Sequence, residues 1–294
     1  MKNNPTLYLR ATVIAASVLA LTTCNTLQGA EQKTRTDFKP DRMAVYKKVG
    51  EVELQMHIFE PVAGKKQPKT PAIVFFFGGG WVGGNPNQFY PHCRHLADLG
   101  MVAMSAEYRI KSTHGTTPFQ CVEDGKSAIR WIRKNAERLG IDSHKIAAGG
   151  GSAGGHVATA TATIPGLDPD SDSPVSPLPN ALVLFNPVYD NGPEGYGYER
   201  VKDRYLEISP MHNIRKGMAP AIVFLGTNDK LIPVKTSEKF KRDMEKVGSR
   251  SELFLYPDQP HGFFNLNKSD GKYYHKTVSE MDRFLKSLGF LLDK

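Results

Sequence analysis

Short, almost uniformly apolar runs recur along the chain. A strand that is buried on both faces shows this pattern, as the strands of a parallel sheet do. Runs of this kind predict strands at residues 71–77, 101–109, 145–150, 180–188, 220–226 and 251–257. Ahead of them, residues 43–61 alternate apolar and polar positions around Gly50, which predicts a β-hairpin.

Between these runs, apolar residues recur at the three- and four-residue spacing of an amphipathic helix. In residues 119–140, Cys121, Val122 and Ile129 follow this spacing, and Gly140 ends the helix. Further helices are predicted at residues 89–100, 153–164, 235–248 and 273–290. Alternating strands and helices predict an α/β fold with one mostly parallel sheet and helices on both faces.

Residues 165–220 interrupt this alternation. They are rich in proline, glycine, aspartate and tyrosine and enclose one strand. We expect long loops and short helices that form a small cap over one end of the sheet, without a separate domain. Residues 64–70 are polar and predict a turn, and residues 31–294 are expected to form a single domain.

The first thirty residues have the order of a secretory signal peptide. Lys2 and Arg10 precede an apolar run over residues 11–24, and Ala30 ends a plausible cleavage site. The apolar run is short for a transmembrane span. An uncleaved anchor helix and a lipoprotein attached at Cys24 remain alternatives. We expect a secreted or periplasmic protein with no stable membrane insertion after cleavage.

The charge pattern limits the partners that can be expected, and the cysteine content limits the possible disulfides. The formal net charge is +8, but basic residues are scattered among acids, so no nucleic-acid partner is predicted. Beyond the leader the chain has two cysteines, Cys93 and Cys121, without a CxxC motif. A disulfide between them and two separate buried thiols are both open.

Residues 149–155 read GGGSAGG, between a predicted strand and a predicted helix. The G-x-S-x-G pattern around Ser152 is typical of a nucleophile elbow, a sharp turn that lifts the serine above the sheet. A phosphate loop would need a G-K-[ST] ending, which is missing here. A dinucleotide site would open the first βα unit and place an acid after the next strand, where this chain has Asn186.

Three other loops follow predicted strands. They offer the remaining groups that a serine hydrolase needs, in the expected order along the chain. Residues 78–80 are glycines whose backbone N–H groups can meet a forming oxyanion together with that of Ala153. Asp229 follows the strand at 220–226, and His261 follows the strand at 251–257. Serine, acid and histidine in this order are typical of an α/β-hydrolase triad.

The segments GGGWVGG, SAEYR, GGGSAGGH, GTNDKLIP and QPHGF resemble the hormone-sensitive-lipase-like branch of the α/β-hydrolase superfamily. Within it, the chain resembles bacterial acetyl esterases and feruloyl-esterase-like proteins. The resemblance covers the chain from about Val52 to its last helix. It implies the α/β-hydrolase fold, no cofactor and no metal. The functional residues it implies are Ser152 as nucleophile, Asp229 as acid, His261 as base, and Gly79, Gly80 and Ala153 as oxyanion donors.

The sequence departs from the family pattern at two positions. The oxyanion loop of the family begins with histidine, whereas this chain has Phe77. The residue before the nucleophile is often acidic, and here it is Gly151. Neither position supplies a triad side chain or an oxyanion donor, so we expect the catalytic machinery to remain.

Several other polar residues have structural explanations. We expect His156 to pack or hydrogen-bond, Arg109 to hold a loop through a buried ion pair, and Asp229 rather than Asp258 to face His261. The aspartates of residues 168–173 resemble the start of a calcium loop. Ser173 stands where that loop needs glycine, and Pro179 where it needs glutamate, so a turn is predicted.

These residues predict a serine carboxylesterase that hydrolyses short acyl esters, most plainly acetyl esters of a carbohydrate or similar alcohol. Aromatic side chains are candidates for substrate contact, namely Trp81, Tyr189, Tyr196 and Tyr198. A serine peptidase resembling the prolyl oligopeptidase group and a non-catalytic binder on the same scaffold are the alternatives.

Overall fold

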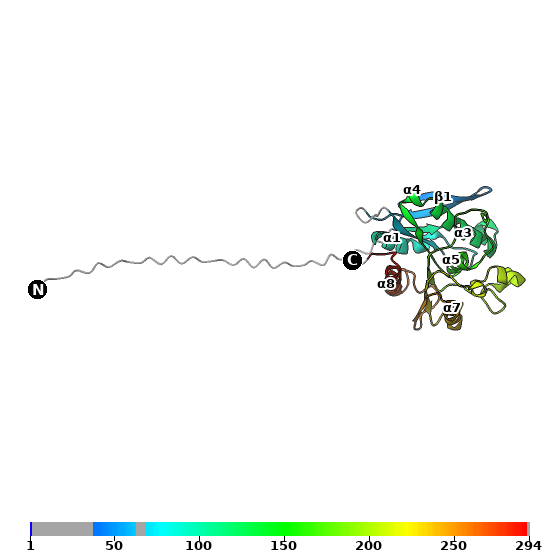
Figure 1. The fold of residues 1–294 in the computed structure, drawn as a ribbon. Helices are drawn as coiled ribbons and strands as arrows, with labels where there is room; N and C mark the ends of the chain where they lie inside the picture. Colours follow the sequence, from blue (N-terminus) through cyan, green and yellow to red (C-terminus); the bar gives the residue numbers. More distant parts are fainter. Residues whose placement is uncertain (2–37, 63–68, 293–294) are drawn as a thin grey trace. The chain divides into compact units, whose positions relative to one another are not determined.

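The computed structural model describes Met1 and residues 38–62 and 69–292 (Figure 1). Apart from Met1, the predicted leader at residues 1–30 lies outside the described residues, and so does most of the predicted turn at residues 64–70.

One sheet runs through the described residues. Its strands in spatial order are β1 (Arg42–Val49), β2 (Val52–Phe59), β4 (Val102–Ala106), β3 (Thr70–Phe76), β5 (Ile141–Gly151), β6 (Ala181–Phe185), β7 (Ala221–Gly226) and β8 (Ser251–Tyr256). β2 pairs antiparallel with β1 and with β4, and all other neighbours are parallel. The predicted hairpin at Gly50 and the mostly parallel sheet are confirmed.

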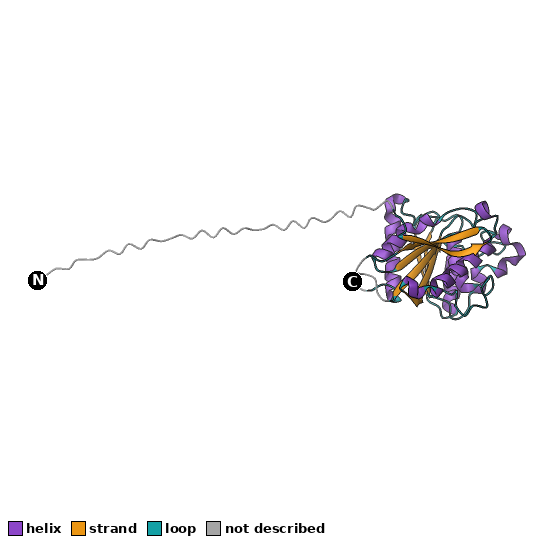
Figure 2. Ribbon diagram, turned by 90° about the horizontal axis from the view of Figure 1, so that it is seen from above, coloured by secondary structure: helices purple, strands orange, loops and turns teal. Residues whose placement is uncertain are grey.

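Helices cover both faces of the sheet (Figure 2). The α-helices are α1 (Tyr90–Asp98), α2 (Lys111–His114), α3 (Pro118–Lys134), α4 (Ala136–Leu139), α5 (Ala153–Thr163), α6 (Tyr198–Val201), α7 (Val234–Lys246) and α8 (Lys272–Ser287). The short 3₁₀ helices are η1 (Pro86–Phe89), η2 (Lys202–Glu207), η3 (Pro210–Asn213) and η4 (Ser269–Gly271). One core contains residues of α3, α5 and α7, and the other contains residues of α1 and α8.

Strand β6 shows why the central runs are uniformly apolar. Leu182 and Leu184 pack into the core on the α5 side, whereas Val183 and Phe185 pack into the core on the α8 side. Each side chain of the strand is therefore buried, and alternation with polar residues disappears.

The two cysteines belong to opposite cores. Cys93 lies in α1 and Cys121 in α3, and both are free and buried, so no disulfide joins them in this structure. Residues 165–220 contain β6 and the short helices α6, η2 and η3. Among the helices of the described part, none is long and apolar enough to cross a membrane.

The parallel strands end at one edge of the sheet. The register pairs Phe76 with Gly150, Gly151 with Phe185, and Gly226 with Tyr256. The loops that follow β3, β5, β6, β7 and β8 consequently start side by side. All predicted catalytic residues lie in these loops.

Candidate active site

Ser152 lies in the sharp turn between β5 and α5. Its backbone has φ 54° and ψ −120°, a conformation that L side chains rarely adopt. Glycine neighbours allow this turn because α5 passes close to β3. A Cβ at Gly154 would come within 2.0 Å of the Phe76 carbonyl oxygen, and one at Gly150 within 2.5 Å of the Gly154 carbonyl. The strained serine is the geometry that a nucleophile elbow requires.

The departure at Gly151 has a packing reason. A Cβ at this position would come within 2.7 Å of the Phe264 ring, which follows the His261 loop. The acidic side chain that the family often carries before its nucleophile therefore has no room here.

Asp229 and His261 meet across two loops. Nδ1 of His261 lies 2.7 Å from Oδ2 of Asp229. The other carboxylate oxygen, Oδ1, accepts the N–H groups of Leu231 (2.8 Å) and Ile232 (3.0 Å). The Asp229 side chain is fully buried, whereas the His261 side chain remains 24% exposed. The carboxylate thus fixes the imidazole and favours the tautomer in which Nδ1 carries the proton.

Asn186 follows the strand next to Ser152 and contacts the loop of the histidine. The N–H of Ser152 donates to the carbonyl of Phe185 (3.0 Å), the residue before Asn186. The Oδ1 of Asn186 accepts the N–H of Gly262 (3.0 Å), and its Nδ2 lies 3.4 Å from Nε2 of His261. The hydroxyl of Ser152 has no hydrogen-bond partner within the part of the chain that the structure describes. From the sequence, Asn186 is only the residue that stands where a dinucleotide site would place an acid.

The glycine loop after β3 passes beside the nucleophile. A Cβ at Gly78 would lie 3.3 Å from Cβ of Ser152. Gly79, Gly80 and Trp81 all have positive φ, at 127°, 62° and 58°. Within the described ranges, the N–H groups of Gly79 and Gly80 have no hydrogen-bond partner. The N–H of Ala153 opens helix α5, where intrahelical acceptors are missing. These three donors are available near Ser152.

Gln88 and Asn265, which could not be predicted from the sequence, support the glycine loop at the end that follows β3. Oε1 of Gln88 accepts the N–H of Gly78 (2.7 Å), and its Nε2 donates to Oδ1 of Asn265 (3.1 Å). Asn265 in turn donates to the carbonyl of Gly262 (2.7 Å). A short polar chain thus links the glycine loop to the residue that follows His261.

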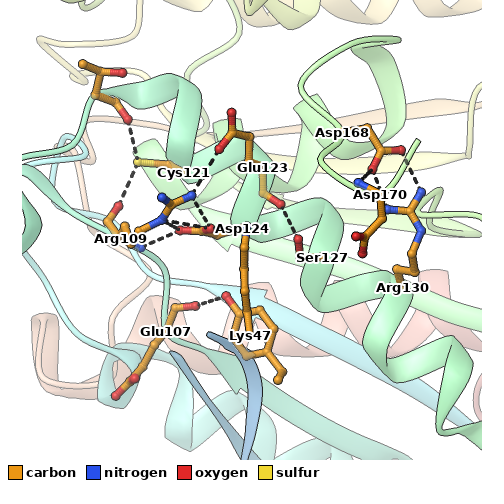
Figure 3. A network of polar contacts seen from close by, with 12 residues as sticks. Lys47, Glu107, Arg109, Cys121, Glu123, Asp124, Ser127, Arg130, Asp168 and Asp170 are labelled. Atoms are coloured by element: carbon orange, nitrogen blue, oxygen red, sulfur yellow. Dashed lines mark hydrogen bonds and ion pairs between the residues drawn. The ribbon is translucent and has the colours of Figure 1, made fainter. Parts of the chain in front are cut away.

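Phe77 replaces the histidine of the family pattern and packs on Tyr108. The two rings stack with centroids 4.2 Å apart, and the Tyr108 hydroxyl donates to the Phe77 carbonyl (2.6 Å). The next residue, Arg109, pairs with Asp124 of α3 (Figure 3). Asp124 is fully buried and also accepts Lys47 of β1 (2.7 Å). The expected buried ion pair of Arg109 is confirmed, and it holds the segment behind the glycine loop.

The aromatic residues predicted to contact substrate divide into two groups. Trp81 is 1% exposed and Tyr189 is 0% exposed, so in this structure neither ring offers a free face to a substrate. Trp81 packs on His156 (5.0 Å between centroids), and Tyr189 stacks on Phe240 of α7 (4.2 Å). Tyr198 is partly buried and its hydroxyl donates to Asp203 (3.1 Å).

Tyr189 and Tyr196 both line an open cleft, and of these two only Tyr196 has part of its side chain exposed. The cleft has a volume of about 360 Å³ and lies between residues 189–199 and residues 230–236. One wall, Lys230 to Ile232, belongs to the loop that holds Asp229. On the opposite wall, the Tyr196 hydroxyl lies 3.2 Å from the position of a Cβ at Gly80. Tyr196 therefore lines the cleft and also lies against the glycine loop.

The remaining sequence predictions can also be compared with the structure. His156 is buried and its Nε2 lies 3.0 Å from the carbonyl oxygen of Ile208, as expected of a hydrogen-bonding residue. Asp258 is exposed, and its N–H donates to Thr227 (2.8 Å), whereas Asp229 faces His261. Asp168 pairs with Arg130 (2.5 Å).

Two buried histidines resist protonation. Burial lowers the pKa of His156 to about 4 and the pKa of His92 to about 3. His92 is fully buried on helix α1, and neither ring nitrogen has a partner among the described residues. Five aromatic rings surround it: Phe75, Phe89, Phe185, Phe264 and Tyr274.

These histidines should make folding sensitive to acid. The unfolded chain binds their protons near pH 6.5 and the folded chain does so only near pH 3 to 4, so stability falls as pH drops below about 6.5. At pH 5 the two sites together are expected to cost roughly 4 kcal/mol. Denaturant unfolding at pH 7.5 and pH 5 measures this loss. His92→Leu should remove about half of this loss of stability, and the exposed control His144→Gln should leave the loss unchanged. An equal loss of unfolding free energy between the two pH values in all three proteins would contradict this role of the buried histidines.

Comparison with known proteins agrees with the fold. The family model described as BD-FAE matches residues 56–176, and the model of the dienelactone hydrolase family matches residues 194–289. Together with the strand order and the similarity to esterases of known structure, these matches define the class. The chain belongs to the α/β-hydrolase superfamily, in the hormone-sensitive-lipase-like branch of esterases.

Particular relatives are esterases. The chain is 44% identical to Thermogutta terrifontis esterase 2, with a TM-score of 0.83 over 88% of this chain and 98% of that one. That enzyme has been solved phosphonylated by cyclosarin and with propionate bound. The chain is also 31% identical to esterase LipC of Mycobacterium tuberculosis over 76% of its length, and 28% identical to an acetylxylan esterase of Xylanibacter ruminicola over 80%. It spans 60% and 48% of the length of these two curated relatives.

Proposed function

We propose that this protein is a serine carboxylesterase that hydrolyses esters of short acyl groups, with Ser152, His261 and Asp229 as its triad. The observation that carries the proposal is the 2.7 Å contact between His261 and Asp229, on loops that leave the same edge of the sheet as the strained turn of Ser152. Backbone strain at a serine is typical of active sites, which favours a catalytic role.

The proposed reaction has two halves. Ser152 Oγ attacks the ester carbonyl carbon while Nε2 of His261 takes the hydroxyl proton, and Asp229 stabilises the imidazolium. The N–H groups of Gly79, Gly80 and Ala153 bind the oxyanion. Collapse of this intermediate breaks the bond to the alcohol oxygen, which receives the proton from His261. Water then attacks the acyl-enzyme with His261 as base, and the carboxylic acid and free serine result.

Two observations favour a short acyl group and a separate site for the alcohol. The similar Thermogutta terrifontis esterase 2 has been solved with propionate and with butyrate bound. In the present chain, the cleft of about 360 Å³ beside the glycine loop offers Tyr196 and the carboxylates of Glu194 and Glu199 to a hydroxylated alcohol. We propose that acetyl esters of carbohydrates are among the substrates.

The proposal is tested by substrate preference and by covalent labelling. The value of kcat/KM should be highest for p-nitrophenyl acetate to butyrate and at least about tenfold lower for the octanoate. An aminoacyl p-nitroanilide should not be cleaved, which separates the esterase from a peptidase. Paraoxon should phosphorylate Ser152, as detected on its tryptic peptide by mass spectrometry. Labelling at another residue, or none, would exclude this serine hydrolase mechanism.

The sequence of residues 1–30 is the basis for a proposal on location. We propose that these residues direct export, so that the esterase acts outside the cytoplasm, with lipid attachment at Cys24 as the alternative. Expression of the full chain followed by N-terminal sequencing of the exported protein tests this, and a first residue of Glu31 is expected.

A further inference from the structure

The backbone carbonyls of residues 79–82 each accept a hydrogen bond, and one of the donors comes from the cap. Gly79 accepts the N–H groups of Val82 and Gly83, both at 3.1 Å. Trp81 and Val82 accept N–H groups of the segment behind the loop, those of Lys111 and Ser112, both at 3.0 Å. The carbonyl of Gly80 accepts a side chain: Nη1 of Arg200, from helix α6.

Arg200 makes further contacts that fix its orientation. Its guanidinium lies over the rings of Trp81 and Tyr196, at 5.6 Å and 5.5 Å from their centroids. Its Nε pairs with Glu199 (3.1 Å), and 31% of the side chain is exposed. A planar guanidinium can stack on rings and donate in its plane at the same time, which an ammonium cannot do.

The contact matters because of where the Gly80 carbonyl lies. The oxyanion donors proposed above are the N–H groups of Gly79 and Gly80, in a run of three residues with positive φ that ends at Trp81. The N–H and the carbonyl of Gly80 are joined only through its Cα, about which φ and ψ rotate, so a fixed carbonyl restricts the rotations that would turn the Gly80 N–H away. An oxyanion donor acts only when it points at the forming charge.

We propose that Arg200 is a positioning residue of the oxyanion hole, which holds the Gly80 carbonyl from the cap so that the N–H groups of Gly79 and Gly80 face the Ser152 site. This inference rests on the proposed esterase function. Because Glu199 and Tyr196 line the cleft and also contact Arg200, the alcohol site and the oxyanion loop share this arginine.

The test compares Arg200→Gln and Arg200→Lys with Arg204→Gln. Arg204 is a matched control because it lies four residues further in the same region, pairs with Glu207 (2.7 Å) and stacks over Phe119. Arg200→Gln should lower kcat for p-nitrophenyl acetate by about 10- to 100-fold, since a lost donor costs roughly 10²- to 10³-fold and this one is displaced rather than removed. KM and the melting temperature should stay close to wild type. Arg200→Lys should recover part of kcat, and Arg204→Gln should not change it.

Hydrogen exchange of the loop provides a readout that needs no turnover. In Arg200→Gln, the amides of Val82 and Gly83, which donate to Gly79, should exchange faster than in wild type, and in Arg204→Gln they should not. A raised KM with unchanged kcat would mean that Arg200 binds substrate, and would overturn the inference. Unchanged exchange would overturn it as well. If the wild-type chain cleaves no ester, the proposed function fails, while the exchange data still decide whether Arg200 holds the loop.

Discussion

Replacing Ser152 by alanine is expected to lower kcat/KM for p-nitrophenyl acetate by at least about 10⁴-fold, because no other hydroxyl occupies the turn between β5 and α5. The oxyanion donors and the cleft are backbone and side chains of other residues, so substrate binding should persist in the variant. Steady-state kinetics of the residual turnover measures kcat/KM, and its inhibition by a competing inhibitor measures binding at the site.

The same position gives a second, independent readout in stability. Alanine has a Cβ like serine, so Ser152→Ala keeps the strain of φ 54° and should melt close to wild type. Glycine adopts this conformation without a steric penalty, so Ser152→Gly should be more stable by about 1 kcal/mol while being equally inactive. Activity that survived in both variants would contradict the triad. A destabilised Ser152→Gly would contradict the strain argument.

Much of the fold could be predicted from the sequence because parallel strands buried on both faces leave a simple pattern. The runs that became β3, β5, β6 and β7 are apolar at almost every position, and the loops after them must share one edge of the sheet. Chain order then placed Asp229 and His261 in neighbouring loops. Their contact of 2.7 Å follows from topology rather than from any local property of these residues.

The supporting residues could not be predicted because their roles depend on tertiary contacts. Asn186 is an ordinary polar residue after a strand until Gly262 and His261 pack against it. Arg200 is one of several basic residues in the cap, and nothing in its sequence neighbourhood points to the Gly80 carbonyl. The available signal for Asn186 was position: a polar residue directly after a buried central strand, at the edge where the catalytic loops meet.

The burial of Trp81 and Tyr189 also depends on tertiary contacts that cannot be predicted from the sequence. Aromatic residues in a loop-rich region suggest a binding surface, yet Trp81 is covered by the backbone of Gly197 and Tyr189 by Phe240. In this chain these two rings are part of the main core on the α5 side of the sheet. The parts of the cap that remain free for a ligand are Tyr196 and the acidic residues around it.

Replacing Asp229 by asparagine is expected to lower kcat/KM by about 10⁴-fold although the side chain keeps its shape. The N–H groups of Leu231 and Ile232 both donate to Oδ1, so this position must remain an acceptor, and the amide of asparagine is forced to place its NH₂ group toward His261. Nδ1 of the imidazole then becomes the acceptor, and the proton moves to Nε2. A histidine with a proton on Nε2 cannot accept one from Ser152.

The matched control is Asp258→Asn, in the loop that carries His261. Asp258 is exposed and contacts Thr227 only through its backbone N–H, so its variant should retain kcat/KM within about twofold. The ¹⁵N shifts of the His261 ring report the tautomer directly: they should show a proton on Nδ1 in wild type and in Asp258→Asn, and on Nε2 in Asp229→Asn. If Asp258→Asn were the inactive variant, the acid would be assigned to the wrong loop. If Asp229→Asn lost activity without a change of tautomer, the carboxylate would act through its charge alone.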